Sequence, residues 1–328
     1  MQCWSWKTAG ALVLAGILIM SSQAQTNAAY HVTRTIQVGG DGSWDYLRFD
    51  PNGKRLFIAR STRVMVVDLV HGKLASEIPD TAGVHGVALI PELHRGVTSN
   101  GKANTATIFD LDTLRPITTV PTGEKPDAIL WEPFSKTVLT MNGRSNSITI
   151  IDPQTGKALG TITLPGRPET AVSDQQGKVF VNLEDKGQIA VVDMAQRTVV
   201  GTWDLAGCTE PTGLAIDIHD KTHRRLFSAC HSGVLVIVDA DTGKSVQQLP
   251  IGNGVDAAAF DAATQTVFTS NGEGSISVIQ QISADSYRNV ETVKTLPGAK
   301  TMALDPNSHL LYTVANQNGQ FVVLEIGR

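Results

Sequence analysis

Four carboxylates and one histidine occupy equivalent places in the chain, each at the start of a short strand in a different repeat. They are Asp45, His85, Asp127, Glu169 and Asp256. If the side chains converge, the carboxylates repel one another unless a cation, an amine or protonation relieves the repulsion. Carboxylate oxygens are also the ligands that Ca²⁺ prefers. The set therefore predicts a site for a small cationic or polyhydroxylated ligand or for Ca²⁺, and the sequence indicates no other cofactor.

Further polar residues lie in the loops between the second and third strands of the repeats. The additional candidates for ligand binding are Asn142, Arg144, Asn271 and Asn316. An alternative interpretation makes all of these residues structural. The asparagines would then serve tight turns that need positive φ, and the acids would accept hydrogen bonds from backbone amides of neighbouring segments.

Catalytic motifs are not assembled anywhere in the sequence. No Ser-His-Asp order stands out, and no Gly-rich loop follows a strand and opens a helix. His219 and His223 have a spacing that could bind a metal on a helix, but they fall in a predicted turn and are expected to be solvated. The chain has 27 basic and 31 acidic residues, a formal charge of −4. This balance disfavours a protein that binds the phosphate backbone of nucleic acids.

The elements that must position these residues are repeated. Short β-branched runs end at Asp68, Asp110, Asp152, Asp193 and Asp239, which are 41–46 residues apart. Two degenerate copies follow and end at Gln280 and Glu325. Each repeat also contains three other short strands and turn signals, and no helical period is sustained. Four strands in a repeat of 40–45 residues are typical of one β-propeller blade.

The ends of the repeat array predict how the ring closes. The seventh repeat ends at Arg328, directly after its third strand, so its fourth strand is missing. A spare strand over residues 32–38 precedes the first repeat and resembles the other fourth strands. We therefore expect an all-β, seven-bladed propeller of four-stranded blades, with the last blade closed by the N-terminal strand. It would form a single domain over residues 25–328 and be a monomer.

The first residues predict export. Lys7 precedes an apolar run over residues 9–20, which is too short to span a membrane comfortably but fits a signal peptide. Small residues at Ser22 and Ala24 suit cleavage after Ala24. The alternative is an uncleaved anchor. We expect residues 1–24 to be a signal peptide, no membrane span in the mature chain, and a periplasmic or secreted protein.

Two cysteines of the mature chain are placed to meet. Cys208 should lie in the loop that enters the fifth blade, and Cys230 should end the second strand of that blade. Both positions are on the same face, on adjacent strands, in an oxidising compartment, which predicts a disulfide. A metal or redox site at Cys230 and His231 is the alternative, but it lacks further ligands at a suitable spacing.

The strand and turn motifs resemble those of the YVTN-repeat β-propellers, in the YncE-like branch of exported bacterial proteins. Residues 312–316 (YTVAN) and 179–182 (VFVN) are close to the motif that names the family, and residues 239–244 match its turn. Arg60 and Cys230 stand where Asn is usual. The resemblance implies a seven-bladed exported propeller. It includes members suggested to bind DNA, and it carries over no catalytic residue.

Together these patterns favour an exported binding or scaffold protein over an enzyme. We expect its loop-rich face around the central axis to bind a small ligand, a cation or a protein partner. One alternative is a lactonase-like hydrolase that holds a metal with Asp127, Glu169, Asn182 and Asp256, although such enzymes are typically six-bladed. A second alternative, single-stranded DNA binding, is suggested by the resemblance and disfavoured by the acidic charge.

Overall fold

The computed structural model describes residues 1–4 and 29–328. The apolar run over residues 9–20 and the predicted cleavage site after Ala24 lie outside the described residues. No helix in the described part of the chain is both long and apolar enough to cross a membrane. Apart from one short 3₁₀ helix, η1 (Pro91–Leu93), the described elements are β-strands.

Twenty-eight strands form seven antiparallel sheets of four. Blades 1 and 2 consist of β2 (Leu47–Asp50), β3 (Arg55–Arg60), β4 (Arg63–Asp68), β5 (Lys73–Ile78), β6 (Val84–Ile90), β7 (Arg95–Asn100), β8 (Thr105–Asp110) and β9 (Pro116–Pro121). Blades 3 and 4 consist of β10 (Pro126–Glu132), β11 (Thr137–Asn142), β12 (Ser147–Asp152), β13 (Lys157–Thr163), β14 (Pro168–Ser173), β15 (Lys178–Leu183), β16 (Gln188–Asp193) and β17 (Thr198–Asp204).

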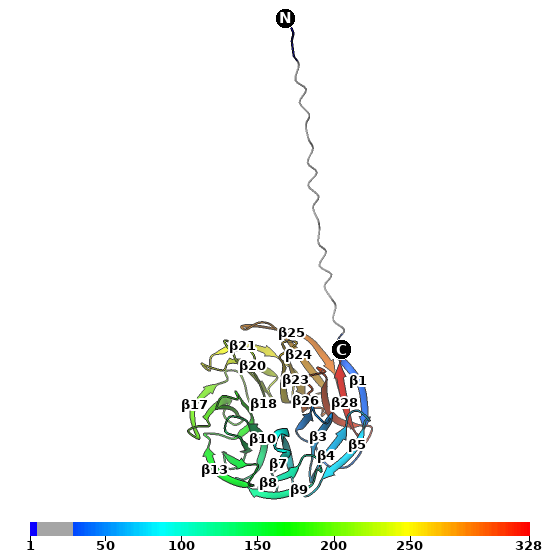
Figure 1. The fold of residues 1–328 in the computed structure, drawn as a ribbon, viewed down its shortest axis with the longest axis vertical. Coiled ribbons are helices and arrows are strands. Elements are labelled where there is room, and N and C mark those ends of the chain that lie inside the picture. Colours follow the sequence, from blue (N-terminus) through cyan, green and yellow to red (C-terminus); the bar gives the residue numbers. More distant parts are fainter. Residues whose placement is uncertain (5–28) are drawn as a thin grey trace.

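The remaining three blades complete the ring (Figure 1). Blades 5 and 6 consist of β18 (Pro211–Asp217), β19 (Arg225–Cys230), β20 (Val234–Asp239), β21 (Ser245–Pro250), β22 (Val255–Asp261), β23 (Thr266–Asn271), β24 (Ser275–Ser283) and β25 (Ser286–Lys294). Blade 7 consists of β26 (Met302–Leu304), β27 (Leu311–Gln317), β28 (Gln320–Gly327) and β1 (His31–Gln37). The predicted seven-bladed propeller is therefore confirmed.

The first strand of the chain closes the ring, as the repeat count predicts. β1 (blue in Figure 1) pairs antiparallel with β28 (red) from His31 opposite Gly327 to Gln37 opposite Val322. Ile36 is buried in the core that blades 7 and 1 share. Tyr30, just before the strand, packs edge-on against Phe268 of blade 6, with ring centroids 5.3 Å apart. β1 thus ties blade 7 to both neighbouring blades.

The segment after β1 is held by Arg60, whose guanidinium is almost completely buried. It donates hydrogen bonds to the backbone carbonyl oxygens of Gly40, at 2.8 Å, and Gly42. The same group lies 3.8 Å from the centre of the Phe321 ring, close enough for a cation–π contact. Arg60, which stands where the resembled repeats carry Asn, therefore fastens the connection between the closing strand and blade 1.

The core lies between adjacent blades. The second strand of several blades carries an aromatic residue at its centre, and that side chain fills the space toward the next sheet. These residues are Phe57, Phe180, Phe227, Phe268 and Tyr312. Phe227, for example, stacks on Phe260 of blade 6 with ring centroids 5.0 Å apart. Contacts between first strands, such as β2 with β26 and β2 with β6, close the innermost ring around the axis.

Candidate functional site

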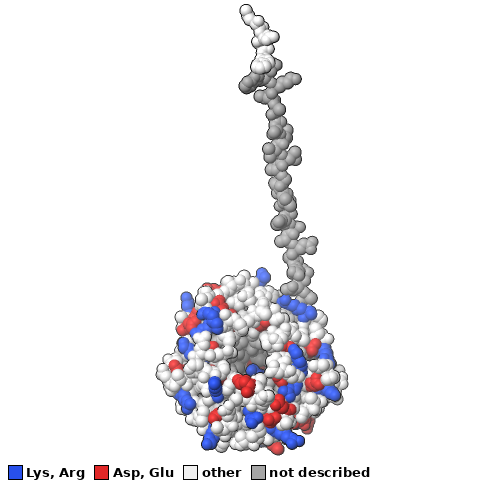
Figure 2. Space-filling view, viewed as in Figure 1, with Lys and Arg blue, Asp and Glu red and all other residues white. Residues whose placement is uncertain are grey.

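The candidate side chains form a ring where the seven innermost strands begin. When the repeats are aligned on Asp50, Ile90, Glu132, Asp174, Asp217, Asp261 and Asp305, which end or directly follow the inner strands, the position five residues earlier carries Asp45, His85, Asp127, Glu169, Thr212, Asp256 and Lys300. The structure therefore brings five of the nine predicted ligand residues to one end of the central axis, and adds Thr212 and Lys300. Figure 2 shows a face of the ring that is hollowed at its centre.

β-Bulges help to orient these side chains. In blades 2 to 6 the pairing of the first strand with the second is irregular at this position. It skips one residue in blades 2, 5 and 6, for example between Val84 and Gly86, and two residues in blades 3 and 4. A bulge leaves one residue out of the ladder and redirects its side chain. The side chains of His85 and Asp256 therefore do not follow the alternation of side chains along a regular strand, which would place them between two sheets.

The backbone of the ring is fixed by the adjacent blades. The carbonyl oxygen of His85 accepts a hydrogen bond from the Tyr46 amide at 3.0 Å, and that of Asp45 accepts one from the Thr301 hydroxyl at 3.0 Å. The Ser270 hydroxyl donates to the Lys300 carbonyl at 2.6 Å. Loops held on a rigid scaffold are the usual places for binding residues. The ring meets that description.

Asp45, His85 and Asp127 form the tightest cluster. His85 Nδ1 lies 2.5 Å from Asp45 Oδ2 and 3.3 Å from Asp127 Oδ1. Burial disfavours the imidazolium form, but the hydrogen bond to Asp45 and the charge of Asp127 outweigh it and raise the pKa of His85. Burial raises the pKa of Asp45 although His85 opposes the shift. One ligand atom from each residue lies within 4.8 Å of the others, a spacing that a metal ion could bridge.

Two lysines neutralise acids of the ring. Lys125 Nζ lies 3.4 Å from Asp127 Oδ2, and Lys300 Nζ lies 2.6 Å from Asp256 Oδ2. Burial raises the pKa of Asp256, whereas the ammonium of Lys300 acts against this rise. The sequence analysis did not select Lys125. Lys125 lies two residues before Asp127, directly before β10. This closeness in the sequence is the signal that could have identified it.

Tyr46 crosses the axis. Its hydroxyl donates a 2.8 Å hydrogen bond to Glu169 Oε1, which joins blade 1 to blade 4. The corresponding residues of the other inner strands are small: Gly86, Ala128, Thr170, Gly213, Ala257 and Thr301. Burial, followed by the charge of Asp127, raises the pKa of Glu169 well above its usual range, although the Tyr46 hydrogen bond acts in the opposite direction. The sequence analysis missed Tyr46. The signal that could have identified it is that a large side chain stands where the other six inner strands carry small ones.

These contacts change the expected electrostatics of the site. From the sequence we expected four carboxylates that repel one another, with little positive charge nearby to offset the repulsion. The structure supplies His85, Lys125 and Lys300 as partners for three of them, and Glu169 accepts a hydrogen bond in a place that favours its neutral form. The ring is therefore a set of closely spaced donors and acceptors with partly balanced charge.

The four loop candidates lie outside the ring cluster. Asn142 is completely buried, and its amide group donates to Ser147 at 3.1 Å and to Thr149 at 2.9 Å within blade 3. Asn271 makes the corresponding bonds to Ser275 and Ser277 in blade 6. Arg144 and Asn316 are exposed. Asn142 and Asn271 are therefore structural, but not in the expected way: neither has a positive φ, and each amide instead bonds hydroxyl groups of its own blade. The ligand site developed below leaves all four residues out.

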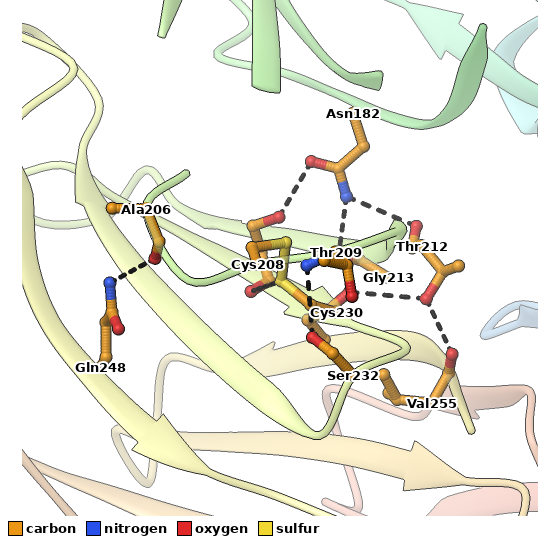
Figure 3. The surroundings of a disulfide bond; sticks show 12 residues. Asn182, Ala206, Cys208, Thr209, Thr212, Gly213, Cys230, Ser232, Gln248 and Val255 are labelled. Atoms are coloured by element: carbon orange, nitrogen blue, oxygen red, sulfur yellow. Dashed lines mark hydrogen bonds between the residues drawn. A yellow bond between two sulfur atoms is a disulfide. The ribbon is translucent and has the colours of Figure 1, made fainter. Parts of the chain in front are cut away.

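The predicted cysteine pair is joined in the structure. Cys208, in the loop before β18, forms a disulfide with Cys230 at the end of β19, and both are buried (Figure 3). Beside it, Asn182 of blade 4 donates to the Gly213 carbonyl at 3.1 Å and accepts from the Ser228 hydroxyl at 3.0 Å. Asn182 therefore links two blades, and its amide is used in that link.

The pair of histidines on the far side of blade 5 matches the expectation of a solvated turn. His219 and His223 are both exposed. His219 lies 3.7 Å from Asp217, whereas His223 lies 3.3 Å from a different carboxylate, Asp220. The two imidazoles do not share a carboxylate within salt-bridge distance in this described segment, so they are left out of the candidate site.

Comparisons with known proteins agree with the architecture. A family model described as outer membrane protein assembly factor BamB matches residues 102–326, more than half of the chain. None of the curated proteins matches the sequence.

Solved structures show the same fold at low identity. The hydrazine synthase of Kuenenia stuttgartiensis is similar over 85% of this chain and 94% of that chain, with a TM-score of 0.74 and 16% identity. A chain from a mitotic checkpoint complex is similar over 99% of this chain and 98% of that one, with a TM-score of 0.76 and 12% identity. At these identities the likeness establishes the fold alone.

Proposed function

Because this chain belongs to the family described as outer membrane protein assembly factor BamB, we propose that it is a binding or scaffold propeller of the periplasm or cell exterior. In this proposal the end of the ring where the inner strands begin holds a small ligand or part of a protein partner. The family description supports a role in binding over catalysis. The YVTN-like strand and turn motifs at residues 312–316 and 239–244 support placing the chain in the YncE-like branch.

The observation that carries this proposal is the convergence of six ionisable side chains and a threonine at one ring position. In a purely structural role, each acid would cap its own loop. Instead His85 contacts Asp45 and Asp127 from two other blades, and Tyr46 reaches Glu169 across the axis. Side chains from separate blades that meet at a channel mouth are typical of a pre-formed polar binding site.

The balanced charge of the ring favours one kind of ligand. Carboxylates that are already paired with His85, Lys125 and Lys300 attract a free cation less than four unpaired acids would. They still accept and donate hydrogen bonds at fixed places. A small polyhydroxylated molecule fits this arrangement best, because each hydroxyl can act both as donor and as acceptor.

A divalent cation at Asp45, His85 and Asp127 is the second candidate, carried by the spacing of their ligand atoms. A histidine in the set suits Zn²⁺ better than Ca²⁺, which prefers oxygen ligands throughout. The lactonase-like alternative gains less support, because the amide of Asn182 is used between blades 4 and 5.

We expect that a ligand of the ring stabilises the wild-type protein against heat and that the variant D127N/E169Q/D256N loses this effect. A ligand present at one hundred times its Kd stabilises by about 2.7 kcal/mol, which shifts Tm by several degrees. Melting curves with a panel of mono- and disaccharides, spermidine, Ca²⁺ and Zn²⁺ measure it.

The matched control changes three exposed acids away from the ring, D80N/E92Q/D112N, and should respond like the wild type. A response to Zn²⁺ or Ca²⁺ that D45N/D127N abolishes would favour the cation candidate instead. If nothing in the panel stabilises the wild type, or if the ring variant keeps the full response, the site does not bind as proposed.

Export supplies a separate prediction. If residues 1–24 are a signal peptide, the protein isolated from its host begins at Gln25 and intact mass spectrometry gives the mass of residues 25–328. An intact chain that starts at Met1 and sediments with membranes would support the uncleaved anchor. A substitution of Ala24 by a large residue should make the precursor accumulate.

A further inference from the structure

The central channel contains a second set of residues, at the end opposite the polar ring. A cavity of 420 Å³ opens where the inner strands of blades 1, 6 and 7 end, beside the turns at Pro51 and Pro306. The polar ring lies where the same strands begin. The cavity is therefore separate from the ring, and the Tyr46–Glu169 hydrogen bond crosses the axis close to the ring end.

Arg48 of β2 is the one charged residue that lines this cavity among the described residues. The corresponding residues on the other inner strands are apolar: Ala88, Leu130, Val172, Ala215, Ala259 and Ala303. Other lining residues include Phe49, Met302 and Leu304. Blade 1 therefore introduces a single guanidinium into surroundings that the repeat otherwise keeps apolar.

The guanidinium of Arg48 lacks a protein partner in the described part of the chain. Its side chain is exposed to the cavity while Leu47 and Phe49 on either side are buried. Arg60, by contrast, donates to the carbonyl oxygens of Gly40 and Gly42. Desolvation by the surrounding protein lowers the pKa of Arg48, and no carboxylate acts against that shift. The side chain is nevertheless open to the cavity, so its donors are free to form charge-assisted hydrogen bonds to an anion that enters.

We propose that this cavity binds a small amphiphilic monocarboxylate, with the carboxylate paired to Arg48 and the hydrocarbon part against Phe49, Met302 and Leu304. A guanidinium presents two parallel N–H donors that match one carboxylate. A single arginine balances one negative charge, which favours a monoanion over a phosphate or a polyanion. The apolar part of the lining shields the hydrocarbon part from water. This site does not depend on the ligand of the polar ring.

The test uses octanoate as the probe and isothermal titration calorimetry of the full mature chain. Octanoate should bind the wild type, and octanol, which has the same chain without the charge, should bind at least about ten-fold more weakly, because hydrogen bonds to a charged group are among the strong ones. Acetate, which lacks the apolar part, should also bind at least ten-fold more weakly. Octyl phosphate distinguishes the head groups and should bind no better than octanoate.

The variant R48Q should reduce octanoate affinity at least about ten-fold, while R48K keeps part of it as a cation without the planar fork. R288Q removes an exposed arginine from the outer strand β25 and should bind like the wild type. Melting curves of the three variants confirm that they fold. Absence of octanoate binding at millimolar concentration, equal binding of octanol, or unchanged binding by folded R48Q would each overturn the proposal.

Discussion

Deletion of residues 32–38 is expected to lower the stability of the propeller more than any single substitution. The deletion removes β1, which pairs with β28 along its length, and leaves the β28 edge without a neighbour. It also removes Ile36 from the core of blades 7 and 1 and the Arg34 hydrogen bond to the Leu69 carbonyl at 2.8 Å. Thermal melting of the purified variant should show a large fall in Tm or loss of soluble protein.

A pair of point substitutions makes the same test without shortening the chain. Ile36→Ala should destabilise by about 2–5 kcal/mol, since it empties a buried site in the closing strand. Thr35→Ala, at the adjacent exposed position of the same strand, should change stability by less than about 0.5 kcal/mol. Chemical denaturation measures both. Equal stability of all variants, the deletion included, would mean that β1 does not close the ring.

Removal of the disulfide is expected to cause the second large loss of stability. Cys208 and Cys230 are 22 residues apart, a loop for which chain-entropy estimates give about 3 kcal/mol of stabilisation. The double variant C208A/C230A should lose about this amount, because its unfolded chain is no longer restricted. Alanine is preferred to serine for the test, since both sites are buried and a new hydroxyl would need a partner.

Reducing agent provides the control for this prediction. Dithiothreitol should lower the midpoint of denaturation of the wild type toward that of C208A/C230A, and should leave the double variant unchanged. Thiol titration of the unfolded, unreduced mature protein should find no free cysteine. Two titratable thiols in that sample would exclude the bond.

The architecture could be predicted from the sequence because each blade repeats the same local signals. The acidic ends of the third strands gave the period, and the spare segment at residues 32–38 completed the count. The ring residues could be identified for the same reason: Asp45, His85 and Asp127 occupy one position of the repeat. A repeat pattern shows which positions are equivalent, and equivalent positions lie at equal height around the axis.

The contacts inside the channel could not be read from the repeat. Tyr46 meets Glu169 only because the ring brings blades 1 and 4 within the length of one side chain across the axis. Arg48 is informative only as a departure from six apolar equivalents, which requires the inner strands to be aligned residue by residue. Asn142 illustrates a different error: its place in a polar loop made it a ligand candidate, whereas at the end of β11 its amide bonds Ser147 and Thr149.

The pairing of β1 with β28 also limits when the ring can close during folding. Thr33 and Glu325 contact each other although 292 residues separate them in the chain. β1 is synthesised long before β28, so the ring cannot close until β28 has also been made. Until then, the incomplete ring has an unpaired strand at each end, and such edges invite association with other chains. Because closure joins segments so far apart in the sequence, we expect it to be a slow step, with the first strand unpaired until it occurs.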